Sequence, residues 1–178
     1  MARRLYANKR GISPVIATVI LVAVTIVVAV AVAYWMGGLT GIYTRYEKVE
    51  ITSCSVQYGD NMTGDFDLEL PGWNASGWKI LINLKNTGSA DTTIDNVLIN
   101  GKLWTDYNQK DNRTAIKYDN TEITGTSGAI SVHVRAGDTA SLTIYVKAGD
   151  APFTSGTLIE IKLHSSGGHE YPRQITLP

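Results

Sequence analysis

The sequence predicts an α+β fold in outline, in which a long N-terminal hydrophobic α-helix is followed by an all-β sandwich head. Two observations carry this prediction. Thirty-four consecutive residues between Arg10 and Arg45 contain no charged side chain, and the 134 residues from Arg45 onward form short runs of alternating apolar and polar positions. A chain of 178 residues also suits one ordinary domain with an added segment better than two full domains.

Charge and cysteine content exclude several classes of protein. The chain has 16 basic and 16 acidic residues, so no overall field directs it toward nucleic acid or an acidic substrate. The distribution is uneven, because residues 1–11 carry four basic side chains and no acidic one, whereas residues 12–178 have a net charge of −4. Cys54 is the single cysteine, which excludes an internal disulfide and a multi-cysteine metal site.

The uncharged segment predicts a helix because of its length. Its core, Ile12–Met36, has 25 residues and is broken only by one serine, one proline and two threonines. Fourteen of the 25 are Ile, Val or Thr, which favours a strand in a soluble protein, but a strand of this length is far outside the usual range. As a helix the segment is long enough to span a bilayer and satisfies its own backbone groups without water. We expect Gly37, Gly38 and Gly41 to loosen or end it.

Three interpretations of this helix compete. The first is a secretory signal peptide cut after Ala33, since small residues precede that position, although the apolar stretch exceeds the usual length of about 7–15 residues. The second is a permanent single-pass anchor that keeps the basic residues before it on the cytoplasmic side. The third is the assembly helix of a filament subunit, from which a short basic leader is removed.

Two basic residues and a glycine stand directly before the hydrophobic segment. They are Lys9, Arg10 and Gly11, and residues 12–18 then read Ile-Ser-Pro-Val-Ile-Ala-Thr. This combination resembles the N-terminus of archaeal type IV pilins, whose basic leader, a class III signal peptide, is removed by a membrane-embedded prepilin peptidase. The resemblance implies cleavage between Gly11 and Ile12, with Arg10 as part of the processing site. Because this cut precedes the hydrophobic segment, the helix survives in the mature protein.

The resemblance divides the chain into three parts. They are a basic leader peptide at 1–11, a hydrophobic filament or transmembrane helix at 12–44, and an extracellular β-sandwich at 45–178. Bacterial type IV pilins have a glutamate at the fifth mature position, where this chain has Ile16, so docking guided by that glutamate is not expected. Archaellum filament proteins usually begin with a glycine-rich sequence without Ser-Pro, which makes the motility filament a weaker match.

Alternating residues predict about eight short strands after Arg45. In the clearest, Trp78–Leu84, the apolar residues share one face, and Asn100-Gly101 between apolar flanks predicts a tight hairpin. The other candidate strands are Val49–Tyr58, Ala115–Tyr118, Ile130–Arg135, Ser141–Lys147, Leu158–His164 and Glu170–Leu177. Short strands with regular turns are typical of an immunoglobulin-like (Ig-like) sandwich. The large residues expected to fill its core are Trp73, Trp78, Trp104 and Phe153.

No catalytic constellation stands out, so we expect no enzyme activity and no cofactor. The nucleophile-elbow, phosphate-loop and dinucleotide-binding motifs are absent from the sequence. We interpret the three histidines as partly exposed strand residues, and Cys54 as a small buried apolar residue. The histidines are His133, His164 and His169.

Three acidic residues alternate along one stretch of the chain. On a strand, Asp65, Asp67 and Glu69 would share one face and form a site for a hard cation such as calcium. No calcium-loop pattern surrounds them, and a solvated acidic edge that blocks unwanted strand pairing explains them equally well. We therefore assign no metal site.

Three Asn-x-Ser/Thr sequons lie in predicted loops, where an attached sugar would face solvent. Their asparagines are Asn61, Asn74 and Asn112, and we expect glycosylation at these positions if the chain is exported.

Small residues recur every four positions along the predicted helix. Ala29, Ala33 and Gly37 form a stripe that lets helices approach one another closely. An alanine-rich membrane helix explains the same residues, so the stripe favours helix–helix assembly only modestly.

Taken with the resemblance, these patterns favour a structural, non-enzymatic subunit of an archaeal type IV pilus-like filament on the cell surface. The resemblance implies adhesion as its role, and as partners other copies of the chain, a prepilin peptidase, the membrane assembly machinery and the membrane before assembly. The alternative is a monomeric membrane-anchored extracellular binding module, for example one for carbohydrate, and the archaellum is a more distant alternative. Nucleic acid is not an expected partner.

Overall fold

The computed structural model describes most of the chain. The described residues are 13–66, 73–108, 113–118, 121–124, 130–149 and 152–178. They form two compact units, Met1–Thr44 and Arg45–Pro178, which are considered separately below.

The first unit contains a single long helix, α1, which spans Pro14–Tyr43. Pro14 stands in its first turn, where the missing N–H has no intrahelical acceptor to lose. At about 1.5 Å per residue, the 30 residues extend over roughly 45 Å. The expected helix is confirmed, but the expectation that Gly37, Gly38 or Gly41 ends it is wrong, since it continues to Tyr43. Each glycine lowers helix stability by only about 1 kcal/mol relative to alanine, and the backbone hydrogen bonds run on past them to Thr44.

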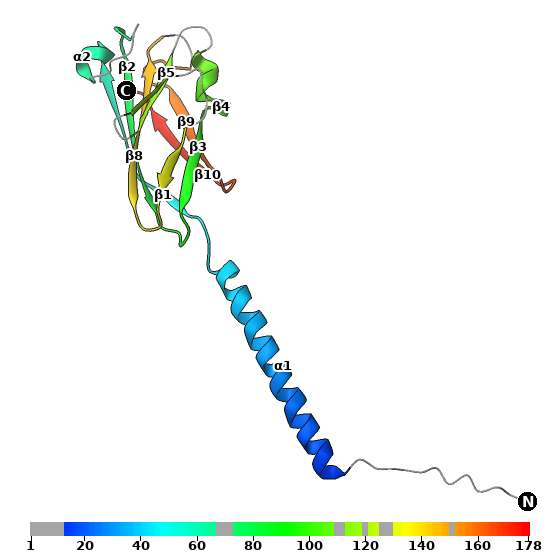
Figure 1. Cartoon of the computed structure of the whole chain (residues 1–178). Coiled ribbons are helices and arrows are strands. Elements are labelled where there is room, and N and C mark those ends of the chain that lie inside the picture. The colour runs from blue at the N-terminus through cyan, green and yellow to red at the C-terminus, as the bar shows by residue number, and fades with distance from the viewer. Residues whose placement is uncertain (1–12, 67–72, 109–112, 119–120, 125–129, 150–151) are drawn as a thin grey trace, which may run out of the picture. The chain divides into compact units, whose positions relative to one another are not determined.

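The second unit, the head, is built from two antiparallel sheets (Figure 1). Its strands are β1 (Val49–Gly59), β2 (Gly77–Asn86), β3 (Thr92–Ile99), β4 (Lys102–Leu103), β5 (Thr114–Tyr118), β6 (Thr121–Thr124), β7 (Val132–Val134), β8 (Thr139–Lys147), β9 (Leu158–Ser165) and β10 (Glu170–Thr176). One sheet has the order β1-β2-β8-β5-β6, and the other has β10-β9-β3-β4, with β7 also paired to β3. Two short helices, α2 (Met62–Asp65) and η1 (Trp104–Tyr107), lie between strands.

The strand order is that of the predicted Ig-like sandwich. When the short strands β4, β6 and β7 are set aside, seven strands remain, the number found in a constant-type immunoglobulin domain. The first, second, fifth and fourth of these make the order β1-β2-β8-β5, which corresponds to the A-B-E-D sheet of an immunoglobulin domain. The third, sixth and seventh are neighbours in the other sheet, in the order β10-β9-β3, and they correspond to strands C, F and G.

The core lies between the two sheets. In β2 the inward residues Trp78, Ile80, Ile82 and Leu84 are all at most 1% exposed, and they belong to one buried cluster with the inward residues of β3, β8 and β9. The four large residues expected in the interior are all buried, but they do not share one core. Trp73 lies in a second, smaller cluster with Met62, Ala115 and Tyr145. This second cluster shows that the connection between β1 and β2 packs on residues of β5 and β8.

The hairpin predicted at Asn100-Gly101 is present between β3 and β4. Both residues have positive φ, 50° for Asn100 and 75° for Gly101, as a two-residue type I′ turn requires. The Asn100 side chain also accepts a hydrogen bond of 2.9 Å from the backbone N–H of Glu160. The hairpin is therefore tied to the start of the neighbouring strand β9.

The first residues of the head are bonded to the turn between β2 and β3. The N–H groups of Thr87 and Gly88 donate to the carbonyl of Lys48 at 2.8 and 3.1 Å, and those of Ser89 and Ala90 donate to the carbonyl of Tyr46 at 3.0 and 3.2 Å. We call residues 46–48 with this turn, 86–90, the linker clasp. Four backbone bonds therefore hold the residues that precede β1 against this turn.

A carboxylate completes the linker clasp. Glu47 accepts hydrogen bonds from the hydroxyls of Thr92 (3.1 Å) and Ser165 (3.3 Å), which belong to two neighbouring strands. Thr92 and Ser165 are both buried, so Glu47 supplies hydrogen-bond acceptors to two hydroxyls that water does not reach easily. The linker clasp therefore connects residues 46–48 to the turn at 86–90 and to strands β3 and β9.

Candidate assembly surface

The most unusual surface of the molecule is the whole circumference of α1. Twelve aliphatic side chains between Val15 and Val32 are 49–69% exposed, and the most apolar 18 residues within Pro14–Gly41 have a mean hydropathy of 3.2, with none of them buried. By length and composition this helix can cross a membrane. A helix that is apolar on all sides is not stable in water as an exposed element, so it requires a lipid or protein environment.

The threonine hydroxyls of α1 are satisfied within the helix. The hydroxyls of Thr18 and Thr25 each donate to a carbonyl three residues earlier at 2.8 Å, and Thr40 donates to the carbonyl of Met36 at 2.9 Å. Because each of these hydroxyls donates to a carbonyl of its own helix, burying it in an apolar environment leaves no hydroxyl donor without a partner. The helix surface is therefore as suited to a dry protein interface as to lipid.

The proposed small-residue stripe lies on one side of α1. Ala29, Ala33 and Gly37 all fall within the helix, and each step of four residues turns about 400°, so the three positions remain within one face. A Cβ atom built at Gly37 meets no atom within 4 Å, so this position is open to an approaching helix. Their role in helix packing remains a prediction.

The proposed processing residues lie outside the described part of the chain. Arg10, Gly11 and Ile12 precede the first described residue, Ser13, and α1 begins one residue later at Pro14. Cleavage between Gly11 and Ile12 therefore remains a prediction.

Two of the three sequon asparagines are described, and both are exposed outside the strands. Asn74 lies in the connection that leads into β2, and Asn61 is the N-cap of α2, where its side-chain oxygen accepts a bond of 3.4 Å from the N–H of Gly64. Asn112 lies outside the described residues. Glycosylation at the three positions remains a prediction.

We expect the native protein to have a mass above that of its polypeptide. Exposed asparagines leave room for sugar, and intact-mass measurement of the protein from its own cell surface checks this. Asn74→Gln should remove one glycan without altering the fold, because Asn74 lies in a loop. Asn61→Gln should remove another and also weaken the α2 cap by about 1 kcal/mol. The bare polypeptide mass would reject occupancy at all three positions, and the sandwich assignment would stand.

Asp65 does not lie on the alternating strand face considered above. Asp65 ends helix α2, and its carboxylate accepts a bond of 3.0 Å from the backbone N–H of Asn61, so it caps the helix. Asp67 and Glu69 lie outside the described residues. The shared strand face is wrong for Asp65, because the local capping bonds favour one turn of helix over a strand.

The histidines have separate partners. His133 lies 3.2 Å from the Thr93 hydroxyl, and His164 lies 2.7 Å from a carboxylate oxygen of Asp95. His169 donates its backbone N–H to the Ser165 hydroxyl in the turn before β10. Across the described ranges, no three His, Cys, Asp or Glu side chains come together as a group that could hold a metal ion.

Cys54 is half-buried in β1 rather than fully buried as expected. Burial raises the pKa of its thiol, and the positive charge of Arg173 opposes this only in part. A raised pKa keeps the thiol protonated at neutral pH, when it is a weak nucleophile. The interpretation of Cys54 as a packing residue therefore agrees with its surroundings.

Sequence reasoning missed the linker clasp and the cavity described below. The turn residues Asn86-Thr87-Gly88 are a sequence signal for a turn, but nothing in the sequence indicates that residues 46–48 are its partners. The cavity joins residues from β1, β2 and the chain end, which no local pattern connects.

Comparisons with known proteins give distant structural likenesses only. No protein-family model and no curated protein matches the chain. Among solved structures, the chain is similar to the archaellum periplasmic stator protein FlaG from Sulfolobus acidocaldarius, with 11% identity and a TM-score of 0.37 over 73% of this chain and 100% of that one. It is also similar to the archaeal flagellum of Methanospirillum hungatei strain JF1, with 12% identity and a TM-score of 0.38 over 93% of this chain and 94% of that one. A third similar structure is the Iho670 flagellar-like filament, with 13% identity and a TM-score of 0.33 over 93% of this chain and 98% of that one.

Proposed function

We propose that the chain is a structural, non-enzymatic subunit of an archaeal type IV pilus-like surface filament. The hydrophobic helix α1 assembles with other copies into the fibre core, and the sandwich heads cover the fibre and make its adhesive contacts. The observation that carries the proposal is the apolar surface of α1, exposed on all sides over Pro14–Met36.

The free energy available from burying this surface is large. Twelve aliphatic side chains are about half exposed, and burying the remainder contributes roughly 1 kcal/mol each, on the order of 10 kcal/mol per subunit. Packing against other helices and insertion into lipid both recover this free energy, so its size alone does not separate a filament from a membrane anchor.

Surface detail favours the filament, whereas length does not separate it from an anchor. The apolar part of the helix, residues 14–36, extends over about 35 Å, so it crosses the bilayer's hydrocarbon core of about 30 Å with an ordinary tilt. The stripe of Ala29, Ala33 and Gly37 offers a face on which a second helix can approach closely.

The proposal includes a processing pathway. A membrane-embedded prepilin peptidase cuts between Gly11 and Ile12, the membrane holds the subunit through α1 before assembly, and an assembly machinery adds it to the fibre. The basic residues before the cut keep the leader on the cytoplasmic side. The finished filament is located outside the cell.

N-terminal sequencing tests the processing step. The native protein is expected to begin at Ile12, because the leader resembles a class III signal peptide and the helix after it is intact. A start at Met1 would contradict processing. A start at Tyr34 would instead show an ordinary secretory signal cut after Ala33.

The alternative function is a monomeric membrane-anchored binding module. The cavity in the head favours it, because a binding module requires a site for a ligand. Recovery of the protein only as a detergent-soluble monomer in the membrane fraction would support this alternative and contradict the filament.

A further inference from the structure

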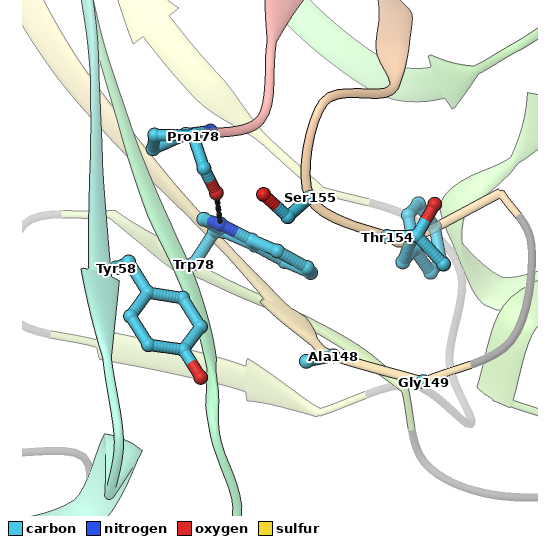
Figure 2. A pocket seen from close by; sticks show the side chains of 8 residues that line it. Tyr58, Trp78, Ala148, Gly149, Thr154, Ser155 and Pro178 are labelled. Atoms are coloured by element: carbon cyan, nitrogen blue, oxygen red, sulfur yellow. Dashed lines mark hydrogen bonds between the residues drawn. The ribbon is translucent and has the colours of Figure 1, made fainter.

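One end of the sandwich carries a cavity that the filament function does not use. Its volume is about 470 Å³, within the range of small-molecule sites. Figure 2 shows the Trp78 indole at its centre, Tyr58 on one side, and Thr154 and Ser155 on the other. We propose that this cavity binds a neutral saccharide, with Tyr58 as the aromatic wall and the hydroxyls of Thr154 and Ser155 as hydrogen-bonding groups.

The aromatic wall is rigid and accessible. The Tyr58 ring packs against the buried Trp78 indole with centroids 5.7 Å apart at 58°, and Tyr58 is still 49% exposed. The Trp78 N–H donates to a backbone oxygen of Pro178 at 3.1 Å, which fixes the indole (Figure 2). An exposed ring held in this way offers a flat apolar surface to a ligand at little entropic cost.

The opposite wall is also held in place before any ligand binds. The N–H of Gly149 donates to the carbonyl of Phe153 at 3.1 Å, and the N–H of Gly156 donates to the carbonyl of Leu177 at 2.7 Å. The hydroxyl of Thr154 lies 2.6 Å from that of Thr157. These bonds keep the exposed residues Thr154 and Ser155 at the mouth of the cavity.

The chemistry of the lining favours one class of ligand. None of the described residues that line this cavity has a charged side chain, so a phosphate, a sugar acid or a carboxylate would find no counter-charge on them. The cavity is open on one side, so a fully apolar ligand would leave part of its surface in water. A sugar ring has an apolar C–H face for the aromatic wall and hydroxyl edges for Thr154, Ser155 and water. This combination matches both halves of the site.

Binding of neutral oligosaccharides to the full-length protein in detergent tests the proposal. The probes are cellotriose, mannotriose, chitotriose and lactose, together with any oligosaccharide released from the native protein itself, measured by titration calorimetry and ligand-observed NMR. Saturable binding to at least one probe is expected. Tightest binding of the released oligosaccharide would identify a sugar on a neighbouring copy as the source, and tighter binding of another probe would identify a foreign surface.

Substitutions locate the binding site. Tyr58→Ala should weaken binding about tenfold or more, and Tyr58→Phe should retain most of it because the ring remains. Ser155→Tyr should block the cavity without disturbing the core, since Ser155 is exposed. This variant tests the site if Tyr58→Ala does not fold. Tyr46→Ala is the matched control, because Tyr46 is equally exposed in the head but its bonds in the clasp are made by its backbone.

Three results would overturn the proposal. They are the absence of saturable binding to every probe up to about 10 mM, unchanged binding in Ser155→Tyr, and equal weakening in Tyr46→Ala. None depends on filament formation, so the saccharide site and the filament proposal can fail independently.

Discussion

Replacing Ala29 and Ala33 together by leucine is expected to leave the protein folded and membrane-inserted but to reduce filament number or length sharply. In lipid the neighbours of α1 are fluid, and two added side chains have little effect on anchoring. In a fibre core each helix packs against copies of itself, and the added volume causes strain of about 1–3 kcal/mol per site. Every subunit carries the same misfit, so its effect on assembly is repeated along the fibre.

Two controls separate packing on the stripe from a general effect of volume. Ala31→Leu adds the same side chain about 200° around the helix from Ala29, and it should reduce filament yield much less. Lys85→Ala, an exposed change in the head, should alter neither insertion nor assembly. Counting filaments in electron micrographs, with membrane fractionation, measures both effects. A wild-type yield from the double leucine variant would remove the support taken from the stripe, and an equal loss from Ala31→Leu would show that the stripe is not special.

Gly88→Ala is expected to destabilise the head by about 3 kcal/mol, with a fall in Tm of roughly 10 °C. A Cβ atom at this position would lie 2.5 Å from the carbonyl oxygen of Tyr46 and 2.6 Å from the backbone nitrogen of Lys48. Both contacts are with backbone atoms, which cannot rotate away as a side chain does. The linker clasp must therefore open, and its backbone hydrogen bonds are lost with it.

Gly64→Ala is the matched control for this effect. The nearest heavy atom to a Cβ at Gly64 is 3.6 Å away, an ordinary contact, so this variant should unfold within a few degrees of the wild type. Thermal unfolding of the full-length protein in detergent, followed by circular dichroism in the β-sheet region, compares the two variants. Similar Tm values for Gly88→Ala and the wild type would show that residues 46–48 are not held against the turn.

Much of the fold could be predicted from the sequence because the signals are local. The length of the apolar segment predicts α1, the alternation along Trp78–Leu84 predicts β2, and the Asn100-Gly101 pair predicts a type I′ hairpin. The glycines Gly37, Gly38 and Gly41 do not end α1, because each costs only about 1 kcal/mol and the backbone hydrogen bonds continue past them. The four-residue helix α2 was missed because one turn is too short to show a helical period.

The surfaces that bear on function could be predicted only in part. The apolar helix surface follows directly from the sequence, because nearly every residue from Pro14 to Met36 is apolar. The linker clasp and the cavity depend on contacts between residues that are distant along the chain, such as the bond between Trp78 and Pro178 or that between Glu47 and Ser165. Such pairings follow from the strand order of the sandwich, which local patterns do not contain.

The central claim is that copies of this chain assemble through α1 into an extracellular filament. Electron microscopy of the sheared cell-surface fraction, with mass identification of the filament protein, tests it most directly. The account predicts filaments composed of this chain with Ile12 as its first residue. A sheared fraction without the chain, with all of it found as a monomer in the detergent-soluble membrane fraction, would contradict the account.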